Sequence, residues 1–153
     1  MTVPFTEAEY YARHTPGVID AVRRRRVGIA GVGGLGSNAA LLLARLGVGS
    51  LVIADYDVIE PSNLNRQNYR ADQVGQQKVF AAAETLRAIN PFINVIPHNI
   101  RLTRETFFDT FNECDVVLEC FDTREAKRMA FAVARTTMQT TPFVLVSGIA
   151  GIG

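Results

Sequence analysis

The sequence predicts an α/β domain in which a mainly parallel sheet carries helices on both faces. Short apolar segments alternate along the chain with segments of helical periodicity, and strands that alternate with helices of about ten to fifteen residues are typical of βαβ units. The length of 153 residues suits one domain, because domains contain about 100–200 residues. The apolar content of 48% supports a core that needs neither disulfides nor a structural metal.

Five apolar segments are expected to form the strands. Most are short and rich in β-branched residues, which favours buried strands over helices. One contains Pro97, which cannot donate to a β-ladder and therefore suits an edge of the sheet. The expected strands lie at residues 26–31, 50–55, 94–98, 115–119 and 143–147.

The segments between these strands are predicted to be helical, apart from a long polar loop at 56–70. Gly47 is placed to cap the first helix, Pro91 ends the second, and Thr103 can cap the third. The helices are expected at residues 34–46, 75–90, 103–111 and 123–138, after a short helical segment near the N-terminus.

Charge and cysteine content narrow the classes of partner. Sixteen Lys and Arg against 15 Asp and Glu give a net charge of +1, so no overall field steers the chain toward nucleic acid or an anionic membrane. Cys114 and Cys120 form no Cys-x-x-Cys pair and imply neither a disulfide framework nor a zinc site. No signal sequence or membrane span of about 18–20 apolar residues is evident. We therefore expect a cytoplasmic protein with a small-molecule or protein partner.

A glycine-rich motif lies between the first expected strand and the first long helix. Residues 31–36, Gly-Val-Gly-Gly-Leu-Gly, fit G-x-G-x-x-G. Its glycines allow a tight turn and a close approach to phosphate, and the helix that follows offers free N–H groups. Asp55 ends the second strand, where an acid can accept hydrogen bonds from a ribose. Together these features predict a Rossmann-like, doubly wound domain that binds a nucleotide.

The polar residues that follow favour a nucleoside triphosphate over a nicotinamide dinucleotide. The carboxyl ends of parallel strands meet at one edge of the sheet, where such folds bind ligands. Arg and Lys can balance phosphate charge, and a spare carboxylate can hold Mg²⁺. No G-x-x-x-x-G-K-[ST] loop occurs, which excludes a P-loop nucleotidase. The side chains expected at this edge are Asp55, Asn63, Arg66, Lys78 and Asp122.

With these motifs, the sequence resembles the ThiF/MoeB superfamily of ubiquitin-activating-enzyme-like adenylyltransferases. The resemblance covers roughly residues 26–153. Its most specific element is the sequence Ser-Asn-Leu-Asn-Arg-Gln at residues 62–67. The sequence as a whole is most similar to the short ThiF-type proteins of thiamine biosynthesis. The other motifs that carry it lie at residues 31–36, 55–61, 74–78, 89–91 and 121–122.

The resemblance implies a homodimeric enzyme that uses ATP and Mg²⁺. It would adenylate the C-terminal glycine of a small ubiquitin-like sulfur carrier ending in Gly-Gly, with release of pyrophosphate. Arg66, Lys78 and Asp122 would be catalytic, with Asp122 as the magnesium aspartate, and Arg13 is the candidate for an arginine lent to the partner subunit. The residues implied to contact the nucleotide are Gly31, Gly33, Gly34, Gly36, Asp55, Asp57, Ser62, Asn63, Asn65, Arg66, Lys78, Asp122 and Thr123.

Three alternatives stay open. A member of the same superfamily could activate a modified tRNA base, an NAD-dependent oxidoreductase could use the same glycine motif, and a binding module could hold nucleotide or carrier without turnover. We divide the chain into an N-terminal helical arm, residues 1–25, and a nucleotide-binding domain, residues 26–153. Longer members of the superfamily continue with further strands, so we expect this domain to be truncated at its C-terminus.

Several residues are assigned no role in the site. The cysteines are expected to be small buried hydrophobes, and the arginines at 23–26 to be a solvated run near a helix end. Phe107, Phe108 and Phe111 are expected to fill the core. The cations at the start of the last helix, Arg124, Lys127 and Arg128, are taken as part of a solvated face.

Overall fold

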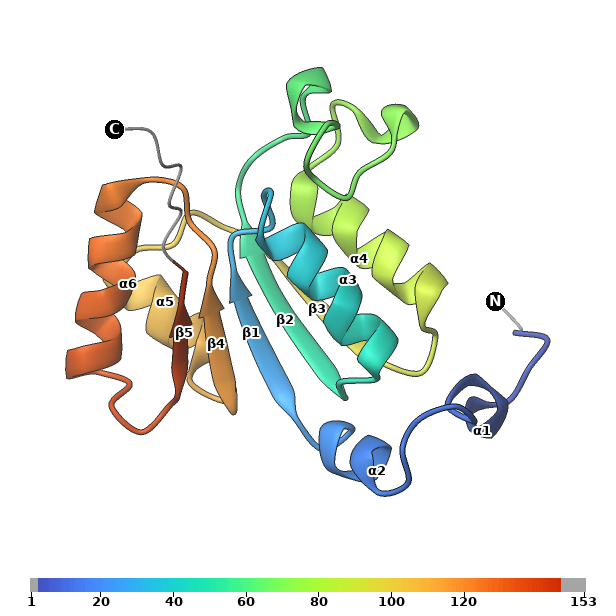
Figure 1. The fold of residues 1–153 in the computed structure, drawn as a ribbon. Helices are drawn as coiled ribbons and strands as arrows, with labels where there is room; N and C mark the ends of the chain where they lie inside the picture. The colour runs from blue at the N-terminus through green and yellow to red at the C-terminus, as the bar shows by residue number, and fades with distance from the viewer. Residues whose placement is uncertain (1–2, 147–153) are drawn as a thin grey trace, which may run out of the picture.

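The computed structural model describes residues 3–146 and contains a five-stranded parallel sheet (Figure 1). The strands follow the order β3-β2-β1-β4-β5, and every pairing between neighbours is parallel. The proline-containing strand lies at an edge, as predicted. The strands are β1 Arg26–Ala30, β2 Ser50–Asp55, β3 Asn94–Asn99, β4 Val116–Glu119 and β5 Phe143–Leu145. The expected glycine-rich ending at 147–153, including the last position of the fifth predicted strand, lies outside the described residues.

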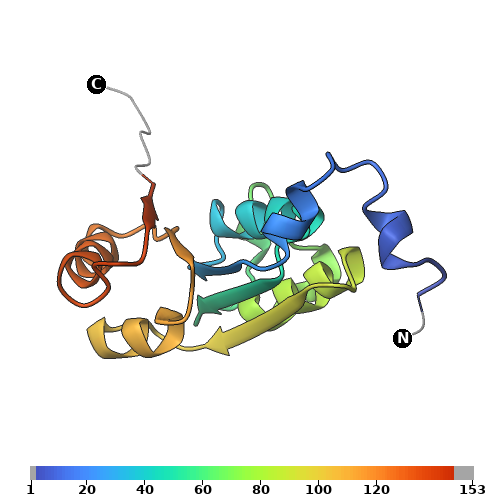
Figure 2. The same ribbon diagram turned by 90° about the horizontal axis from the view of Figure 1, so that it is seen from below.

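Helices cover both faces of the sheet, which confirms the predicted α/β class (Figures 1 and 2). Side chains of α3 and α4 pack into one hydrophobic core, and those of α5 and α6 into a second core on the opposite face. The helices are α1 Glu7–Tyr10, α2 Val18–Val22, α3 Gly36–Leu46, α4 Lys78–Ile89, α5 Arg104–Phe111 and α6 Arg124–Thr136, with 3-10 turns at Pro61–Asn63 and Ala71–Gln73. Among the described residues, no helix is long and apolar enough to cross a membrane.

Helix α4 begins later than the sequence predicts because the preceding residues belong to the loop. Gly75 has φ +89°, outside the helical region, and Gln77 forms an isolated antiparallel bridge with Val58. Helix α3 likewise begins at Gly36, because the residues before it form the turn after β1. Gly47 caps the end of α3 in the left-handed conformation, as predicted.

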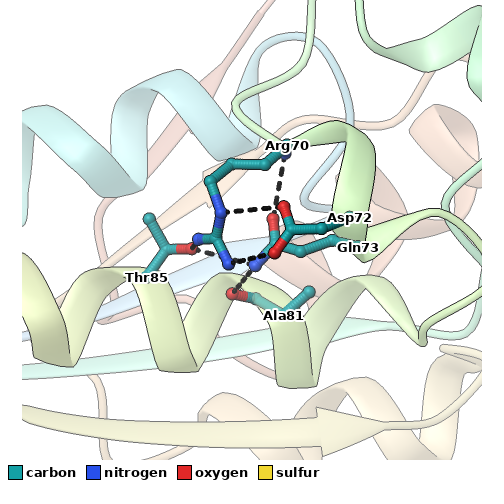
Figure 3. Close-up of polar contacts among 5 residues, drawn as sticks. All are labelled: Arg70, Asp72, Gln73, Ala81 and Thr85. Carbon is teal, nitrogen blue, oxygen red and sulfur yellow. Dashed lines mark hydrogen bonds and ion pairs between the residues drawn. The ribbon is translucent and has the colours of Figure 1, made fainter.

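The loop between β2 and α4 is anchored to α4 by a buried glutamine (Figure 3). Gln73 is fully buried. Its Oε1 accepts the N–H of Arg70 at 3.0 Å, and its Nε2 donates to Thr85 Oγ1 at 3.3 Å and to the carbonyl oxygen of Ala81 at 3.4 Å. Arg70 also pairs with Asp72 at 3.0 Å. The loop is therefore a folded unit with a defined position over α4.

The N-terminal arm packs against the loops at the amino ends of the strands (Figure 1). The fully buried Asn90 donates through Nδ2 to the Tyr11 hydroxyl and to the carbonyl oxygen of Ala44, both at 2.7 Å. Arg23, Arg24 and Arg25 are exposed, as expected for a solvated run, whereas Arg26 at the start of β1 is half-buried. Ion pairs join Arg23 to Glu7, Arg25 to Asp115 and Arg26 to Glu113.

The three phenylalanines of α5 and the two cysteines occupy buried or half-buried positions, as expected. Phe107 and Phe111 are fully buried, and Phe108 packs half-buried against the same core. Cys114 and Cys120 are both buried. Burial raises the pKa of each thiol to about 11, so neither forms a reactive thiolate at neutral pH.

We expect both thiols to be unreactive in the folded chain. At pH 8, a pKa of about 11 in place of the usual 9.0 leaves roughly a hundredfold less thiolate, because each pH unit is a factor of ten. Labelling with a thiol-reactive disulfide reagent should be slower in the native than in the urea-unfolded chain by at least about that factor.

The same shift makes folding stability depend on pH. Between pH 9 and 11 the unfolded chain loses thiol protons that the native chain retains, so the free energy of unfolding should fall as the pH rises through this window. Rapid labelling of native protein at pH 8, or stability that rises from pH 9 to 11, would contradict the burial of these thiols.

Candidate nucleotide-binding site

The turn between β1 and α3 has room for glycine alone at two positions. Gly31 has φ +90°, and a Cβ atom there would also lie 3.2 Å from the carbonyl oxygen of Cys120. A Cβ atom on Gly36 would overlap the carbonyl oxygen of Gly31. The first turn of α3 therefore packs directly against the end of β1, which is the role the glycine motif predicts.

This close packing leaves unpaired N–H groups at the start of α3. Gly31 donates to the carbonyl oxygen of Ala54 at 2.8 Å, so its N–H is occupied. Within residues 3–146, the N–H groups of Gly33, Gly34 and Leu35 donate to no protein atom, and all three residues line a pocket. Free N–H groups at a helix N-terminus attract anions, so the turn suits a phosphate group.

Asp55, at the end of β2, connects the glycine turn to the loop that follows it. Its Oδ2 accepts the N–H of Val32 at 2.8 Å, and its Oδ1 accepts the N–H of Asp57 at 2.9 Å. Each carboxylate oxygen can accept a further hydrogen bond, and the residue lines the pocket. The carboxylate can therefore hold a ribose hydroxyl while it fixes the backbone on both sides.

Lys78 is a buried cation on the pocket wall. It is the first residue of α4, and its Nζ lies 2.7 Å from Asp57 Oδ2. The lysine side chain is 7% exposed, whereas that of Asp57 is 48% exposed. One ion pair leaves two of the three ammonium hydrogens for other acceptors.

Arg66 lies beside the glycine turn. A Cβ atom on Gly34 would be 3.7 Å from Arg66 Cγ. The Arg66 Nη1 donates to the carbonyl oxygen of Ser62 at 2.9 Å and to Asn65 Oδ1 at 3.1 Å. These bonds hold the side chain, and the remaining guanidinium donors stay available to a phosphate.

These groups line one pocket of about 1370 Å³ at the carboxyl ends of the strands. Its walls come from the turn after β1, the end of β2, the segment after β3, the β4–α6 loop with the first turns of α6, and the end of β5. Pockets for small molecules measure about 300–1,000 Å³. The pocket therefore exceeds the usual volume of a small-molecule site.

Asp122 lies exposed at the pocket in the loop before α6. The next residue, Thr123, caps α6, because its side chain accepts the N–H of Ala126 at 3.3 Å. In the described part of the chain no group of three His, Cys, Asp or Glu could hold a metal ion. Mg²⁺ is commonly held by one or two carboxylates, substrate phosphates and water, so Asp122 fits a Mg²⁺ ion carried by a nucleotide better than a metal site built by the protein alone.

Most of the predicted site residues meet in this pocket. Those on its wall are Gly31, Gly33, Gly34, Asp55, Asp57, Arg66, Lys78, Asp122 and Thr123.

The other predicted residues lie off the wall and have local roles. Asn63 is buried, and its Oδ1 accepts the N–H of Glu60 at 3.0 Å. Ser62 Oγ lies 3.3 Å from a Glu60 carboxylate oxygen, and Asn65 holds Arg66. Gly36 packs against the turn. Arg13 belongs to the segment between α1 and α2, two elements that lie toward the amino ends of the strands (Figure 1). Direct contact of these residues with nucleotide stays a prediction.

Two buried polar residues near the glycine turn were not predicted from the sequence. Gln67 lies on the pocket wall, where its Oε1 has no hydrogen-bond partner among the described residues, and the Tyr69 hydroxyl supports the turn by donating to the carbonyl oxygen of Val32 at 2.7 Å. Burial raises the pKa of Tyr69, with a smaller contribution from the charges of Asp55 and Asp57. The tyrosine therefore stays protonated and keeps donating at neutral pH.

A buried ion pair on the pocket wall was also missed. Glu119, the last residue of β4, is 2% exposed and pairs with Lys127 of α6 at 3.0 Å. The expectation that Lys127 belongs to a solvated face is wrong, because its ammonium points to this carboxylate. A glutamate directly after the apolar Val-Val-Leu of a buried strand was the available signal.

Comparison with known proteins identifies related sequences. The sequence model of the ThiF family matches residues 11–152. Ubiquitin-like modifier-activating enzyme 5 of Caenorhabditis elegans is 40% identical over an alignment of 126 positions, and the match covers 75% of this chain and 30% of that protein. The protein of the same name from Aedes aegypti is 39% identical over an alignment of 127 positions, and that match covers 75% of this chain and 32% of that protein. The chain thus spans about a third of the length of these relatives.

Solved structures share the fold over a larger part of the chain. The Escherichia coli tRNA N6-threonylcarbamoyladenosine dehydratase in complex with ATP matches with a TM-score of 0.84 and 26% identity, over 99% of this chain and 65% of that one. E. coli MccB with AMPCPP and MccA matches with a TM-score of 0.76 and 25% identity, over 85% of this chain and 39% of that one.

The two neighbouring glycines allow a matched test of the turn. Gly36→Ala should destabilise the chain by about 3 kcal/mol or more, because its methyl group overlaps the Gly31 carbonyl and must push α3 away from β1. Gly34→Ala should cost less than about 1 kcal/mol, since the nearest atoms are 3.7 Å away in a flexible arginine side chain. Urea unfolding measures both free energies, and equal losses in the two variants would contradict the described packing.

Proposed function

The chain belongs to the ThiF family, and on this premise we propose that it binds ATP at the carboxyl edge of its sheet and adenylates the C-terminal glycine of a small ubiquitin-like protein. The observation that carries the proposal is the convergence of free turn N–H groups, Asp55, Arg66 and Lys78 on one pocket. These groups suit a ribose followed by a chain of phosphates. The ATP complex of a structural neighbour supports the choice of nucleotide.

The proposed chemistry needs positioning and charge balance rather than a protein nucleophile. A C-terminal carboxylate is already ionised at neutral pH. Its oxygen attacks the α-phosphorus, a new O–P bond forms, and the bond from the α-phosphorus to the bridging oxygen of pyrophosphate breaks. Arg66 and Lys78 stabilise the negative charge that develops on the phosphates. The buried Cys120 on the wall, with a pKa of about 11, takes no covalent part.

Asp122 is our candidate for the carboxylate that accompanies Mg²⁺. The ion, when bound, would neutralise phosphate charge and strengthen pyrophosphate as a leaving group. Asp122 lies at the pocket with no hydrogen-bond or ion-pair partner among residues 3–146, so its carboxylate is free to contact an ion or its bound water.

For the acceptor we propose a small ubiquitin-like protein that ends in Gly-Gly. The names of the curated relatives, ubiquitin-like modifier-activating enzymes, support this class. Within it, the sequence resemblance favours a sulfur carrier of thiamine biosynthesis or a related sulfur-transfer pathway. A second copy of the chain would supply Arg13 to the site, because the segment between α1 and α2 that carries this residue lies toward the amino ends of its own strands, away from the pocket.

A modified tRNA base is the second candidate acceptor, because one structural neighbour is a tRNA-modifying dehydratase. The charge distribution favours the protein acceptor. The net charge is +1, and the arginine run lies at the amino ends of the strands, where Arg25 and Arg26 pair with carboxylates of the segment before β4. At the pocket, the cations Arg101, Arg124 and Arg128 are mixed with carboxylates such as Asp122 and Glu125, whereas a surface for RNA is expected to be uniformly basic.

Nucleotide choice can be tested by calorimetry on this chain. We expect Mg·ATP to bind with micromolar affinity and NADH to show no heat of binding at the same concentrations, because the pocket offers cations and free N–H groups for a triphosphate. Tight NADH binding without ATP binding would overturn the proposal in favour of an oxidoreductase.

Turnover can be tested by exchange of labelled pyrophosphate into ATP. Exchange by the protein should depend on a ubiquitin-like partner ending in Gly-Gly and should be abolished when those two residues are removed from the partner. Exchange driven by tRNA instead would support the second candidate. ATP binding without exchange under either condition would identify a binding module.

The phosphate and metal assignments can be tested by matched variants. Arg66→Ala and Asp122→Asn should each lower the exchange rate by about 10²–10³, the usual cost of one group that stabilises transition-state charge. Arg104→Ala and Asp109→Asn change the same residue types on α5, away from the pocket, and should leave the rate unchanged. Full activity of either pocket variant would show that its assignment is wrong.

A further inference from the structure

A buried carboxylate shapes the loop that carries Asp122. Glu119 is 2% exposed at the end of β4. Its Oε1 accepts the N–H of Phe121 at 2.7 Å and lies 3.0 Å from Lys127 Nζ, while its Oε2 lies 3.2 Å from the same nitrogen. The glutamate therefore bends the backbone immediately after its own strand and binds a cation from α6.

Lys127 completes the connection between three elements. Its side chain is 29% exposed, and its Nζ also donates to the carbonyl oxygen of Val146 at 2.7 Å. The ammonium thus contacts the end of β4 and the residue that follows β5 by one position, while its own backbone belongs to α6. All three of its hydrogens have an acceptor.

The loop between β4 and α6 is fixed on both sides of Asp122. The Cys120 N–H donates to the carbonyl oxygen of Ala30 at 2.9 Å, and the Phe121 N–H is held by Glu119. On the other side, Thr123 caps α6. Asp122 is the residue between these anchors, and it lines the pocket.

A stability role accounts poorly for this pair. Taking two charges out of water offsets most of their attraction, and apolar residues of similar volume are often as stabilising as a buried ion pair. The pair also lies on the pocket wall. Its contacts converge on the backbone that sets the direction of Asp122.

We propose that Glu119 and Lys127 are positioning residues, which hold the 120–123 loop so that the Asp122 carboxylate meets the metal that accompanies the nucleotide. This inference rests on the proposed function, in which Asp122 contacts Mg²⁺. Partners that orient a metal ligand typically contribute a factor of about 10–100 in metal affinity or activity.

Calorimetry of ATP binding, with and without Mg²⁺, tests this role. Glu119→Gln keeps an acceptor for the Phe121 N–H and removes the charge that holds Lys127. We expect its metal-free ATP affinity to stay within about twofold of wild type, while the gain in affinity on adding Mg²⁺ falls by about 10–100-fold. Glu113→Gln removes an ion pair with Arg26 at the opposite end of the sheet and should retain the full gain.

The double variant Glu119→Gln with Lys127→Met covers the case in which an unpaired Lys127 prevents folding, because it leaves no uncompensated charge. It should also lose the Mg²⁺-dependent gain. An unchanged gain in a folded variant that binds metal-free ATP would overturn the positioning role alone. Failure of the wild-type chain to bind ATP in either condition would overturn the proposed function and this inference with it.

Amide hydrogen exchange provides a measurement that needs no nucleotide. In Glu119→Ala, the N–H of Phe121 should exchange at least about tenfold faster than in wild type, because its acceptor is gone. The neighbouring N–H of Cys120, bonded to Ala30, should keep its protection and serves as an internal control. Unchanged exchange at Phe121 would show that Glu119 does not hold the loop.

Discussion

The shape of the pocket depends on the close packing of α3 against the turn before it, which leaves no room for a side chain. Because Gly36 lies against the carbonyl oxygen of Gly31, the first turn of α3 must begin directly at the end of β1. The N–H groups there have no helical partner and face the pocket. A larger residue would separate helix from strand, and the positive end of the helix would no longer coincide with the crevice at the strand ends.

The long loop after β2 keeps its place because it is attached to this turn and to α4. Asp55 accepts N–H groups from both the turn and the loop, and Tyr69 returns to bond the turn at Val32. Gln73 then secures the loop to α4. Arg66 lies between these attachments, so an exposed arginine on a loop acquires a defined position beside the glycine turn.

The backbone features of the site could be predicted from sequence, but several side-chain roles could not. Parallel strands and a glycine turn place Asp55 and Lys78 at one edge whatever the loops do, and both lie there. The role of Asn63 depends on local loop geometry, and its side chain caps Glu60 instead of lining the wall. The partnership of Glu119 with Lys127 joins a strand to the next helix, and no local periodicity reveals which helical face a buried carboxylate will meet.

The two lysines on the pocket wall differ in what they can do because their partners differ in burial. Asp57 is half-exposed, so water can solvate its carboxylate if Lys78 turns to a phosphate, and the phosphate then replaces the charge partner of the buried ammonium. Glu119 is buried, and separating it from Lys127 would strand a charge at a cost of about 3–5 kcal/mol. The two lysines therefore have different roles: Lys78 can exchange its carboxylate partner for a ligand, whereas Lys127 must remain part of the protein framework.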